Sequence, residues 1–283
     1  LALHWPYPII LQAAGNFFNG DSDGINPPSD EFVNHKGYNS LAVGNHNDSA
    51  GAMSNSSVFR NPATTHRDRE LPEICANGTS VTTVGLTKSG TSMAAPAAAG
   101  AAALIQSANT SVKTWPEGCR AILLAGAKRN VVGDTWWTDV LDNDDASDGS
   151  GAVDALESTR IAQSRRSKNA AGVLRGWNAG LLTSNDFGGD GLSTFDYKVK
   201  LPSFVFGPRH VKVALAWTSR VSTFDIFGIE LPIASTLTVD LDLKIFDSNG
   251  AQVGYSGSWD NSYEIAEFTG APGATYTIRI RRW

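Results

Sequence analysis

A serine set among small residues is the position in this chain best suited to nucleophilic chemistry. Ser92 lies within residues 90–96 (GTSMAAP) and precedes an alanine-rich run at 94–103. Small neighbours let a substrate backbone approach, and a hydroxyl nucleophile needs a nearby N–H group to hold an oxyanion. The run predicts a helix beginning near Ser92, where unpaired N–H groups and the helix dipole favour negative charge. We expect Pro96 in the first turn, where N–H groups have no partner within the helix.

An asparagine earlier in the chain is a second candidate for the same chemistry. The apolar run at 8–14 ends in Gly15 and Asn16. Such a run predicts a buried strand of a parallel sheet, and ligands gather at the carboxyl ends of such strands. The carboxamide of Asn16 would lie at that end with its N–H groups available. We interpret Asn16 and Ser92 as parts of one oxyanion site.

These two segments resemble the subtilisin-like serine proteases, the subtilase family. Residues 90–96 match the family's serine motif, and residues 13–16 (AAGN) are similar to its oxyanion strand. The resemblance implies that Ser92 is the nucleophile and that Asn16 is the second oxyanion donor. It also implies that three residues support the oxyanion site, namely Gly15, Gly90 and Thr91. Two further residues, Ala14 and Phe17, are implied to border the substrate. An apolar Phe17 would disfavour basic substrate residues.

The resemblance extends over roughly residues 7–165 and implies an α/β fold. Residues 38–44, 73–78 and 149–162 are similar to a family strand, a family turn and the closing turn and helix. We therefore expect residues 1–168 to form the C-terminal portion of a doubly wound parallel sheet. The predicted activity is hydrolysis of peptide bonds in a protein or peptide substrate.

The general base and its orienting carboxylate are not recognisable in this sequence. A serine nucleophile needs a histidine and an aspartate, which precede the serine in subtilases, and no His-Gly-Thr-His occurs here. The histidines, which we expect in loops or packing roles, are His4, His35, His46, His66 and His210. We hypothesise that both residues lie in an upstream segment, the N-terminal part of the same protease, which stays bound. The alternatives are a pseudoprotease and a binding module on the same scaffold.

After a basic break at 164–169, the sequence changes to alternating apolar and polar residues. The alternating segments are residues 195–201, 211–217, 237–245 and 276–281. Period-two alternation predicts half-buried strands, so we expect residues 169–283 to form an all-β sandwich of jelly-roll type. This region resembles the β-domains appended to secreted subtilases.

Acidic residues in this second region are candidates for a structural Ca²⁺ ion. In the appended domains that it resembles, an Asp-Leu-Asp-Leu strand and a later Asp-Asn can lie near calcium. The corresponding candidates here are Asp240, Asp242, Asp247 and Asp260. Calcium takes six to eight oxygen ligands, and a solvated acidic face explains the same pattern.

Composition favours a secreted enzyme over a nucleic-acid or membrane protein. The formal charge is −5, from 23 basic and 28 acidic residues, which argues against anionic partners. No apolar stretch approaches the roughly 20 residues that span a bilayer. Cys75 and Cys119 allow either one disulfide or two buried thiols, and the sequence leaves both alternatives open.

Overall fold

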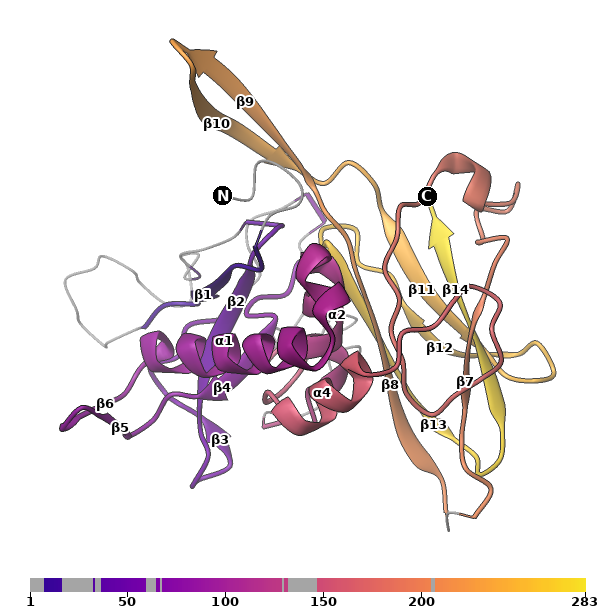
Figure 1. Cartoon of the computed structure of the whole chain (residues 1–283), viewed down its shortest axis with the longest axis horizontal. Coiled ribbons are helices and arrows are strands. Elements are labelled where there is room, and N and C mark those ends of the chain that lie inside the picture. The colour runs from indigo at the N-terminus through magenta and orange to yellow at the C-terminus, as the bar shows by residue number, and fades with distance from the viewer. Residues whose placement is uncertain are drawn as a thin grey trace.

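The computed structural model has two parts that lie side by side. Figure 1 shows the indigo-to-magenta residues as a small sheet with helices, and the orange-to-yellow residues as long strands. The described residues are 8–16, 33, 37–59, 65–66, 68–128, 130–131, 147–204 and 207–283.

A mainly parallel sheet forms the centre of the first part. Its strands are β1 (Leu11–Ala13), β2 (Leu41–Asn47) and β4 (Ile74–Asn77), and β3 (Ala52–Met53) pairs antiparallel with the end of β2. β2 lies between β1 and β4, and its residues 41–46 are buried, as expected for a strand covered on both faces. β1 lies at an edge of this sheet. A separate hairpin consists of β5 (Val81–Thr83) and β6 (Leu86–Lys88).

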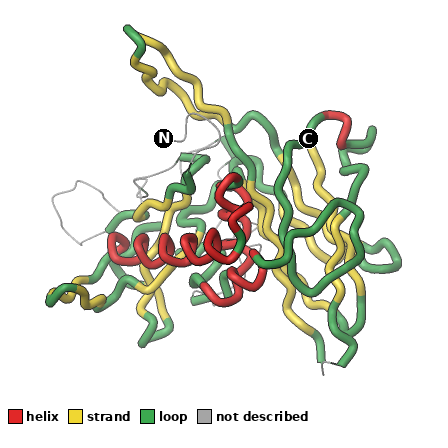
Figure 2. Tube along the Cα trace, viewed as in Figure 1, coloured by secondary structure: helices red, strands yellow, loops and turns green. Residues whose placement is uncertain are grey.

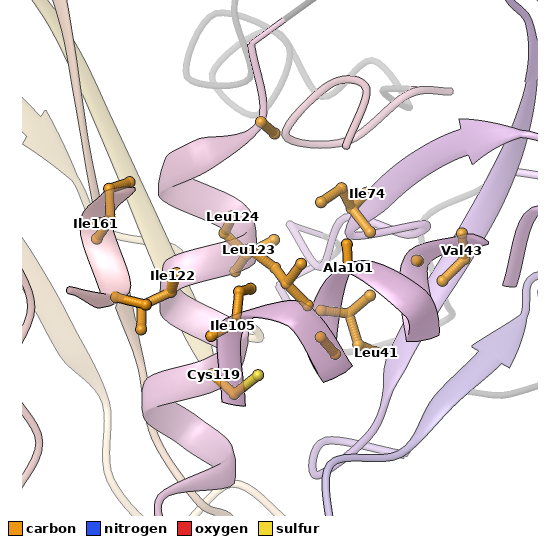
Figure 3. Close-up of a cluster of buried hydrophobic side chains, with 14 of the residues drawn as sticks. Leu41, Val43, Ile74, Ala101, Ile105, Cys119, Ile122, Leu123, Leu124 and Ile161 are labelled. Carbon is orange, nitrogen blue, oxygen red and sulfur yellow. The ribbon is translucent and has the colours of Figure 1, made fainter. Parts of the chain in front are cut away.

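Among its described residues, this part has three α-helices, drawn in red in Figure 2. They are α1 (Thr91–Ala108), α2 (Pro116–Gly126) and α4 (Ala155–Ala162); short 3₁₀ turns occupy Thr110–Thr114 and Ser184–Asp186. α1 packs on β1, β2 and β4. The buried alanines of α1 let it approach the sheet, and Figure 3 shows Leu41, Ile105 and Leu123 meeting in the resulting core. Each such side chain contributes about 1.5–3 kcal/mol when buried. Among the described helices, none is both long and apolar enough to span a bilayer.

The position of Pro96 differs from the expectation that it lies in the first turn of the helix. The helix begins at Thr91, so Pro96 is its sixth residue and lies in the second turn rather than the first. Proline has no N–H group to donate to the carbonyl four residues earlier, which here belongs to Ser92. The carbonyl of the candidate nucleophile therefore lacks its normal helical hydrogen bond.

The second part consists of antiparallel strands. One sheet has the order β12-β11-β14-β7, a second pairs β13 with β8, and β9 and β10 form a hairpin. The bounds are β7 (Tyr197–Lys200), β8 (Arg209–Ala216), β9 (Arg220–Ile226), β10 (Ile229–Thr236), β11 (Leu241–Phe246), β12 (Gln252–Ser256), β13 (Tyr263–Gly270) and β14 (Thr275–Arg282). Each of the four alternating segments overlaps one of these strands.

Alternate side chains of the β12-β11-β14-β7 sheet and of the β13–β8 sheet share one apolar cluster. Val211 of β8 and Phe268 of β13 pack with Leu243 and Ile245 of β11 and with Ile278 of β14. The period of two in the sequence thus supplies the buried face of each sheet. The β9–β10 hairpin instead projects away from both parts (Figure 1).

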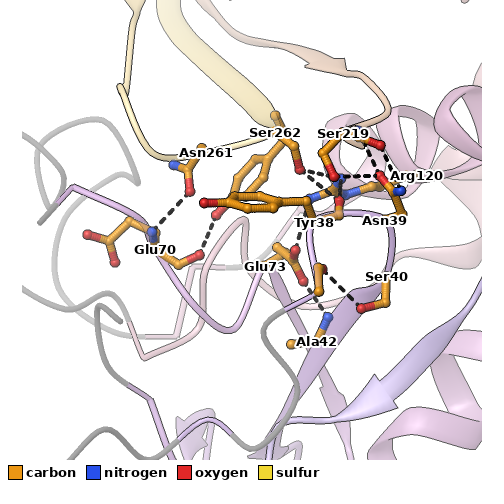
Figure 4. A network of polar contacts seen from close by, with 12 residues as sticks. Tyr38, Asn39, Ser40, Ala42, Glu70, Glu73, Arg120, Ser219, Asn261 and Ser262 are labelled. Carbon is orange, nitrogen blue, oxygen red and sulfur yellow. Dashed lines mark hydrogen bonds and ion pairs between the residues drawn. The ribbon is translucent and has the colours of Figure 1, made fainter. Parts of the chain in front are cut away.

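A buried ion pair joins the two parts (Figure 4). The guanidinium of Arg120 in α2 lies 2.9 Å from a carboxylate oxygen of Glu73, next to β4. The same guanidinium donates to the carbonyl of Tyr38 at 2.8 Å and to the hydroxyl of Ser262, before β13, at 2.9 Å. Glu73 also accepts the N–H group of Ala42 in β2. One arginine therefore connects the parallel sheet, a helix and an antiparallel sheet.

The hydrophobic core also crosses the predicted boundary between residues 168 and 169. Tyr263 and Ile265 of β13 belong to the same buried cluster as Leu123 of α2. The boundary stays a prediction, and these contacts make the two parts mutually dependent.

Both cysteines are buried thiols, which is the second of the two alternatives left open by the sequence. Burial raises the pKa of the Cys119 thiol to about 12, and the side chain packs in the core beneath α1. We therefore expect it to be inert toward thiol reagents in the folded protein.

Glu73→Gln should lower the free energy of unfolding by about 3–5 kcal/mol, because it leaves the buried charge of Arg120 uncompensated. Urea denaturation followed by circular dichroism measures this loss. The double variant Glu73→Gln, Arg120→Met removes both members of this pair and should recover part of the lost stability; the nearby buried Arg69, whose charge Glu73 also offsets, is unchanged in it. A single variant as stable as the original chain would contradict the role of this pair.

Candidate active site

Ser92 is the second residue of α1 and its side chain is exposed. The structure therefore confirms that this serine lies at a helix N-terminus. The helix has no acidic residue in its first turn, so no carboxylate of its own neutralises the positive end of its dipole. A negative charge forming next to Ser92 would be stabilised there.

Asn16 follows the carboxyl end of β1, and its side chain reaches the start of α1. The carboxamide oxygen of Asn16 accepts the backbone N–H of Thr91 at 2.9 Å and is 3.3 Å from the Thr91 hydroxyl. The backbone N–H of Gly15 donates to that hydroxyl at 3.2 Å. The strand end and the helix start, far apart in sequence, are thus held together by three short contacts.

The hydrogen bonds of the first helical turn leave a particular donor available. The N–H of Thr91 is taken by Asn16, and those of residues 93 and 94 donate to the carbonyl of Gly90 at 2.9 and 3.3 Å. Within the described part of the chain, the N–H of Ser92 has no acceptor. The carboxamide of Asn16 is oriented by its oxygen, and its N–H₂ group forms no hydrogen bond within the described residues, so it is a candidate for a second donor. Two converging donors are the arrangement that an oxyanion requires.

Gly90 is needed for this arrangement on two grounds. Its φ of 146° lies in a region that side chains rarely adopt. A Cβ atom at Gly90 would also lie 3.1 Å from the carboxamide oxygen of Asn16 and 3.3 Å from its nitrogen. Any side chain at this position would therefore press on the group that orients the site.

The two residues predicted to border the substrate have different outcomes. Ala14 is fully buried and packs with Val33, Ala42 and Leu71, so its side chain faces the core and cannot contact a substrate. Only its backbone remains available for that role. Phe17 lies outside the described residues.

None of the described histidines is hydrogen-bonded to Ser92. His46 is buried within β2, His66 has its Nδ1 atom 3.1 Å from Asp260, and His210 has its Nε2 atom 3.4 Å from Glu267. His4 and His35 lie outside the described residues. The candidate site thus holds an exposed serine at a helix N-terminus, and no described histidine is hydrogen-bonded to that serine.

The predicted calcium ligands are brought together only in part. Asp240 lies close enough to Asp242 and Asp260 that their charges add to burial in raising the pKa of Asp240 to about 6. Asp247 lies at the opposite end of β11, about 20 Å away along the strand, and its carboxylate accepts N–H groups of the following turn. These four residues therefore cannot ligate a single ion.

Asp68 and His66, which the sequence analysis did not select as metal ligands, lie next to Asp260. Asp68 accepts the N–H groups of Trp259 and Asp260, and burial together with the charge of Asp260 raises its pKa. His66 lies beside Asp260 and stacks on Trp259 with ring centroids 5.3 Å apart. Both come from the first part of the chain, so no local pattern could have linked them to residues 240–260. Across the described ranges, no group of three His, Cys, Asp or Glu side chains is arranged to hold a metal ion.

Gly90→Ala should destabilise the chain by about 1–3 kcal/mol, because it forces a strained φ and a contact with Asn16. Gly100→Ala is the matched control in the same helix, where a Cβ atom meets nothing within 4 Å. That control should stabilise the chain by up to about 1 kcal/mol, since alanine favours helix. Thermal denaturation measures both, and equal effects of the two variants would contradict the packing described for Gly90.

Comparison with known proteins places these observations in a family. Two crystal structures of the epidermin leader peptide processing serine protease from Staphylococcus aureus share distant similarity with this chain. The mutant form is 19% identical over 54% of this chain and 40% of that one, with a TM-score of 0.38. The other form is 20% identical over 56% and 41%, also with a TM-score of 0.38. This chain thus spans about two fifths of those proteins, and likenesses this distant carry no argument about its site.

No curated protein sequence matches the chain. The family model for subtilases (Peptidase_S8) matches residues 8–165, more than half of the chain, and this range includes both Asn16 and Ser92. The chain belongs to the subtilase family.

Proposed function

We propose that this chain supplies the nucleophile and oxyanion site of a serine endopeptidase. The observation that carries the proposal is the hydrogen bond from the N–H of Thr91 to the Asn16 carboxamide at the start of α1, one residue before Ser92, whose own N–H has no acceptor among the described residues. Such donors stabilise the tetrahedral intermediate of acyl transfer more strongly than the planar substrate. The proposed substrate is a protein or peptide.

In the proposed reaction, the Oγ atom of Ser92 attacks the carbonyl carbon of a peptide bond while a histidine takes its proton. The carbonyl oxygen becomes negative and is held by Asn16 and the N–H of Ser92. The C–N bond then breaks, and the same histidine protonates the departing amine. Water hydrolyses the resulting acyl-enzyme ester and restores the serine hydroxyl.

We propose that the histidine and its aspartate come from another segment, the N-terminal part of the same protease. Two surfaces that the described residues leave uncovered support this. β1 occupies an edge of the parallel sheet, where a further strand could pair. α1 carries no basic or acidic residue among its 18 and leaves Leu104 55% exposed. An apolar helix face and an open sheet edge are features that a missing half of a doubly wound fold would cover.

The same proposal includes the complete sheet of the protease, the sandwich fold of the second part and secretion of the protein. The parallel strands would continue into a doubly wound sheet, and residues 169–283 would form an accessory sandwich. The long loops and the low fraction of charged residues, 18%, support a secreted protein.

Fluorophosphonate labelling tests the proposed nucleophile. The chain assembled with its upstream segment should be modified at Ser92, as located by peptide mapping. The chain alone should not react, because a serine hydroxyl without its base is a poor nucleophile. Ser92→Ala should abolish labelling, whereas Ser89→Ala, an exposed serine just upstream, should not. Asn16→Ala in the assembled protease should lower kcat by about 10²–10³. An assembled complex that resists labelling would favour a pseudoprotease.

A structural calcium ion stays a prediction for this chain. One carboxylate oxygen of Asp240 is buried without a hydrogen-bond partner in the described part of the chain, and Asp68 and Asp260 add negative charge nearby. The described side chains alone form no metal site, but a cation held there with further oxygen ligands would relieve this repulsion, so EDTA should lower the melting temperature at pH 7 and added Ca²⁺ should restore it. An unchanged melting temperature would remove calcium from the account.

A further inference from the structure

A large cavity lies between the start of α2 and the second part of the chain, and no residue of α1, the helix that carries Ser92, lines it. Its volume is about 880 Å³, within the range of about 300–1,000 Å³ typical of ligand sites. The N-terminal half of α2, one edge of β8, the segment at 166–187 and strands of the larger sheet enclose it. No residue of the predicted oxyanion site lines this cavity.

The walls of the cavity are largely apolar. Leu215 and Trp217 contribute from β8 and just beyond it, and Phe195, Leu241 and Ile280 also line the cavity. The last three form a buried cluster against which Leu215 and Trp217 pack. Such walls offer water few hydrogen bonds, so binding of an apolar occupant would be favoured.

Hydrogen bonding along β8 leaves one row of backbone groups without partners. The N–H of Trp217 donates to the carbonyl of Ser262 at 3.0 Å, which fixes this pair as hydrogen-bonded. In an antiparallel ladder such pairs alternate, so odd-numbered residues of β8 bond to β13 and even-numbered residues face away. Ala214 and Ala216 are even-numbered and line the cavity. No other described strand pairs with β8, so their N–H and C=O groups point to its open edge.

Charged residues at the cavity are mostly basic. The ionisable lining residues are Glu117, Arg166, Lys168, Arg175, Lys198 and Arg282. Lys168, Arg175 and Lys198 have carboxylate partners in Asp186, Glu157 and Asp196. Arg166 and Arg282 form no ion pair within the described ranges. Glu117 accepts a hydrogen bond from the Thr218 hydroxyl and offsets one of these charges, which leaves a net positive charge that favours an acidic group on the occupant.

We propose that this cavity binds an extended peptide that pairs with the open edge of β8 as an added strand. The peptide carries apolar residues for the walls and an acidic residue for Arg166 and Arg282. Val213 to Thr218 all line the cavity, so the matching peptide stretch is about six residues, or about 20 Å.

A fatty acid would also match the apolar walls and the basic rim. An alkyl chain, however, has no groups to bond with the backbone of Ala214 and Ala216. Buried backbone groups are almost always paired, so closing the cavity over an alkyl chain would leave them unsatisfied. A peptide strand satisfies the walls, the charge and the backbone together.

Amide hydrogen exchange measured by NMR on the whole chain tests the proposal. The probe is an acetylated eight-residue peptide with two aspartates followed by alternating valine and threonine. At saturation, exchange of the Ala214 and Ala216 amides should slow at least about tenfold, while that of Val213 and Leu215, already bonded to β13, should change little. Binding without slower exchange at Ala214 and Ala216 would overturn the proposal, as would a failure to bind.

Backbone methylation of the probe separates strand addition from simple apolar contact. Methylating alternate N–H groups on one edge of the peptide should weaken binding about tenfold or more, and methylating those on the other edge should not. Equal effects of the two peptides would contradict the proposal, as would tight binding of lauric acid with no binding of the peptide.

Variants of the chain test the same two contacts. Ala214→Pro removes one N–H at the open edge without breaking the ladder to β13, so it should reduce peptide binding at least about fivefold. Arg166→Gln with Arg282→Gln should weaken binding of the acidic probe and leave a probe with asparagines unchanged. Arg279→Gln, outside the cavity, is the matched control. Unaltered binding of the acidic probe to the double variant would exclude the assigned charge contact.

Discussion

The hydrogen bond between the carboxamide oxygen of Asn16 and the N–H of Thr91, 2.9 Å long, is the contact on which the candidate site depends. It occupies one donor of the first helical turn and fixes the Asn16 amide next to Thr91, the residue that precedes Ser92. Without it, a strand end and a helix start would be neighbours with no defined chemistry. Gly90 permits the contact by leaving room for Asn16.

The same contact explains why the site needs both layers of the first part. β1 brings Asn16 to the carboxyl edge of the sheet, and the alanines of α1 let the helix approach that sheet closely. The Arg120–Glu73 pair then fastens this sheet to the antiparallel strands, through Ser262. Geometry at Ser92 is thus supported by packing and by a buried charge pair some distance from it.

Sequence patterns predicted the parts of this structure that depend on local periodicity or on short motifs. The apolar run before Asn16, the alanine helix after Ser92 and the four alternating segments all correspond to described elements. Pro96 was misplaced although the start of the helix was predicted to within one residue, because a first turn of about 3.6 residues ends before position 96. The sequence could not predict that His66, Asp68 and Asp260 lie together, nor that β8 has an open edge. Both features depend on contacts between segments distant in sequence.

The most direct measurement of the central claim is a crystal structure of the assembled protease with a peptide boronate or phosphonate bonded to Ser92. The account predicts that one oxygen of the adduct lies about 2.7–3.1 Å from both the backbone nitrogen of Ser92 and the carboxamide nitrogen of Asn16. An adduct oxygen directed away from both donors, or an Asn16 side chain turned away from Thr91, would contradict it.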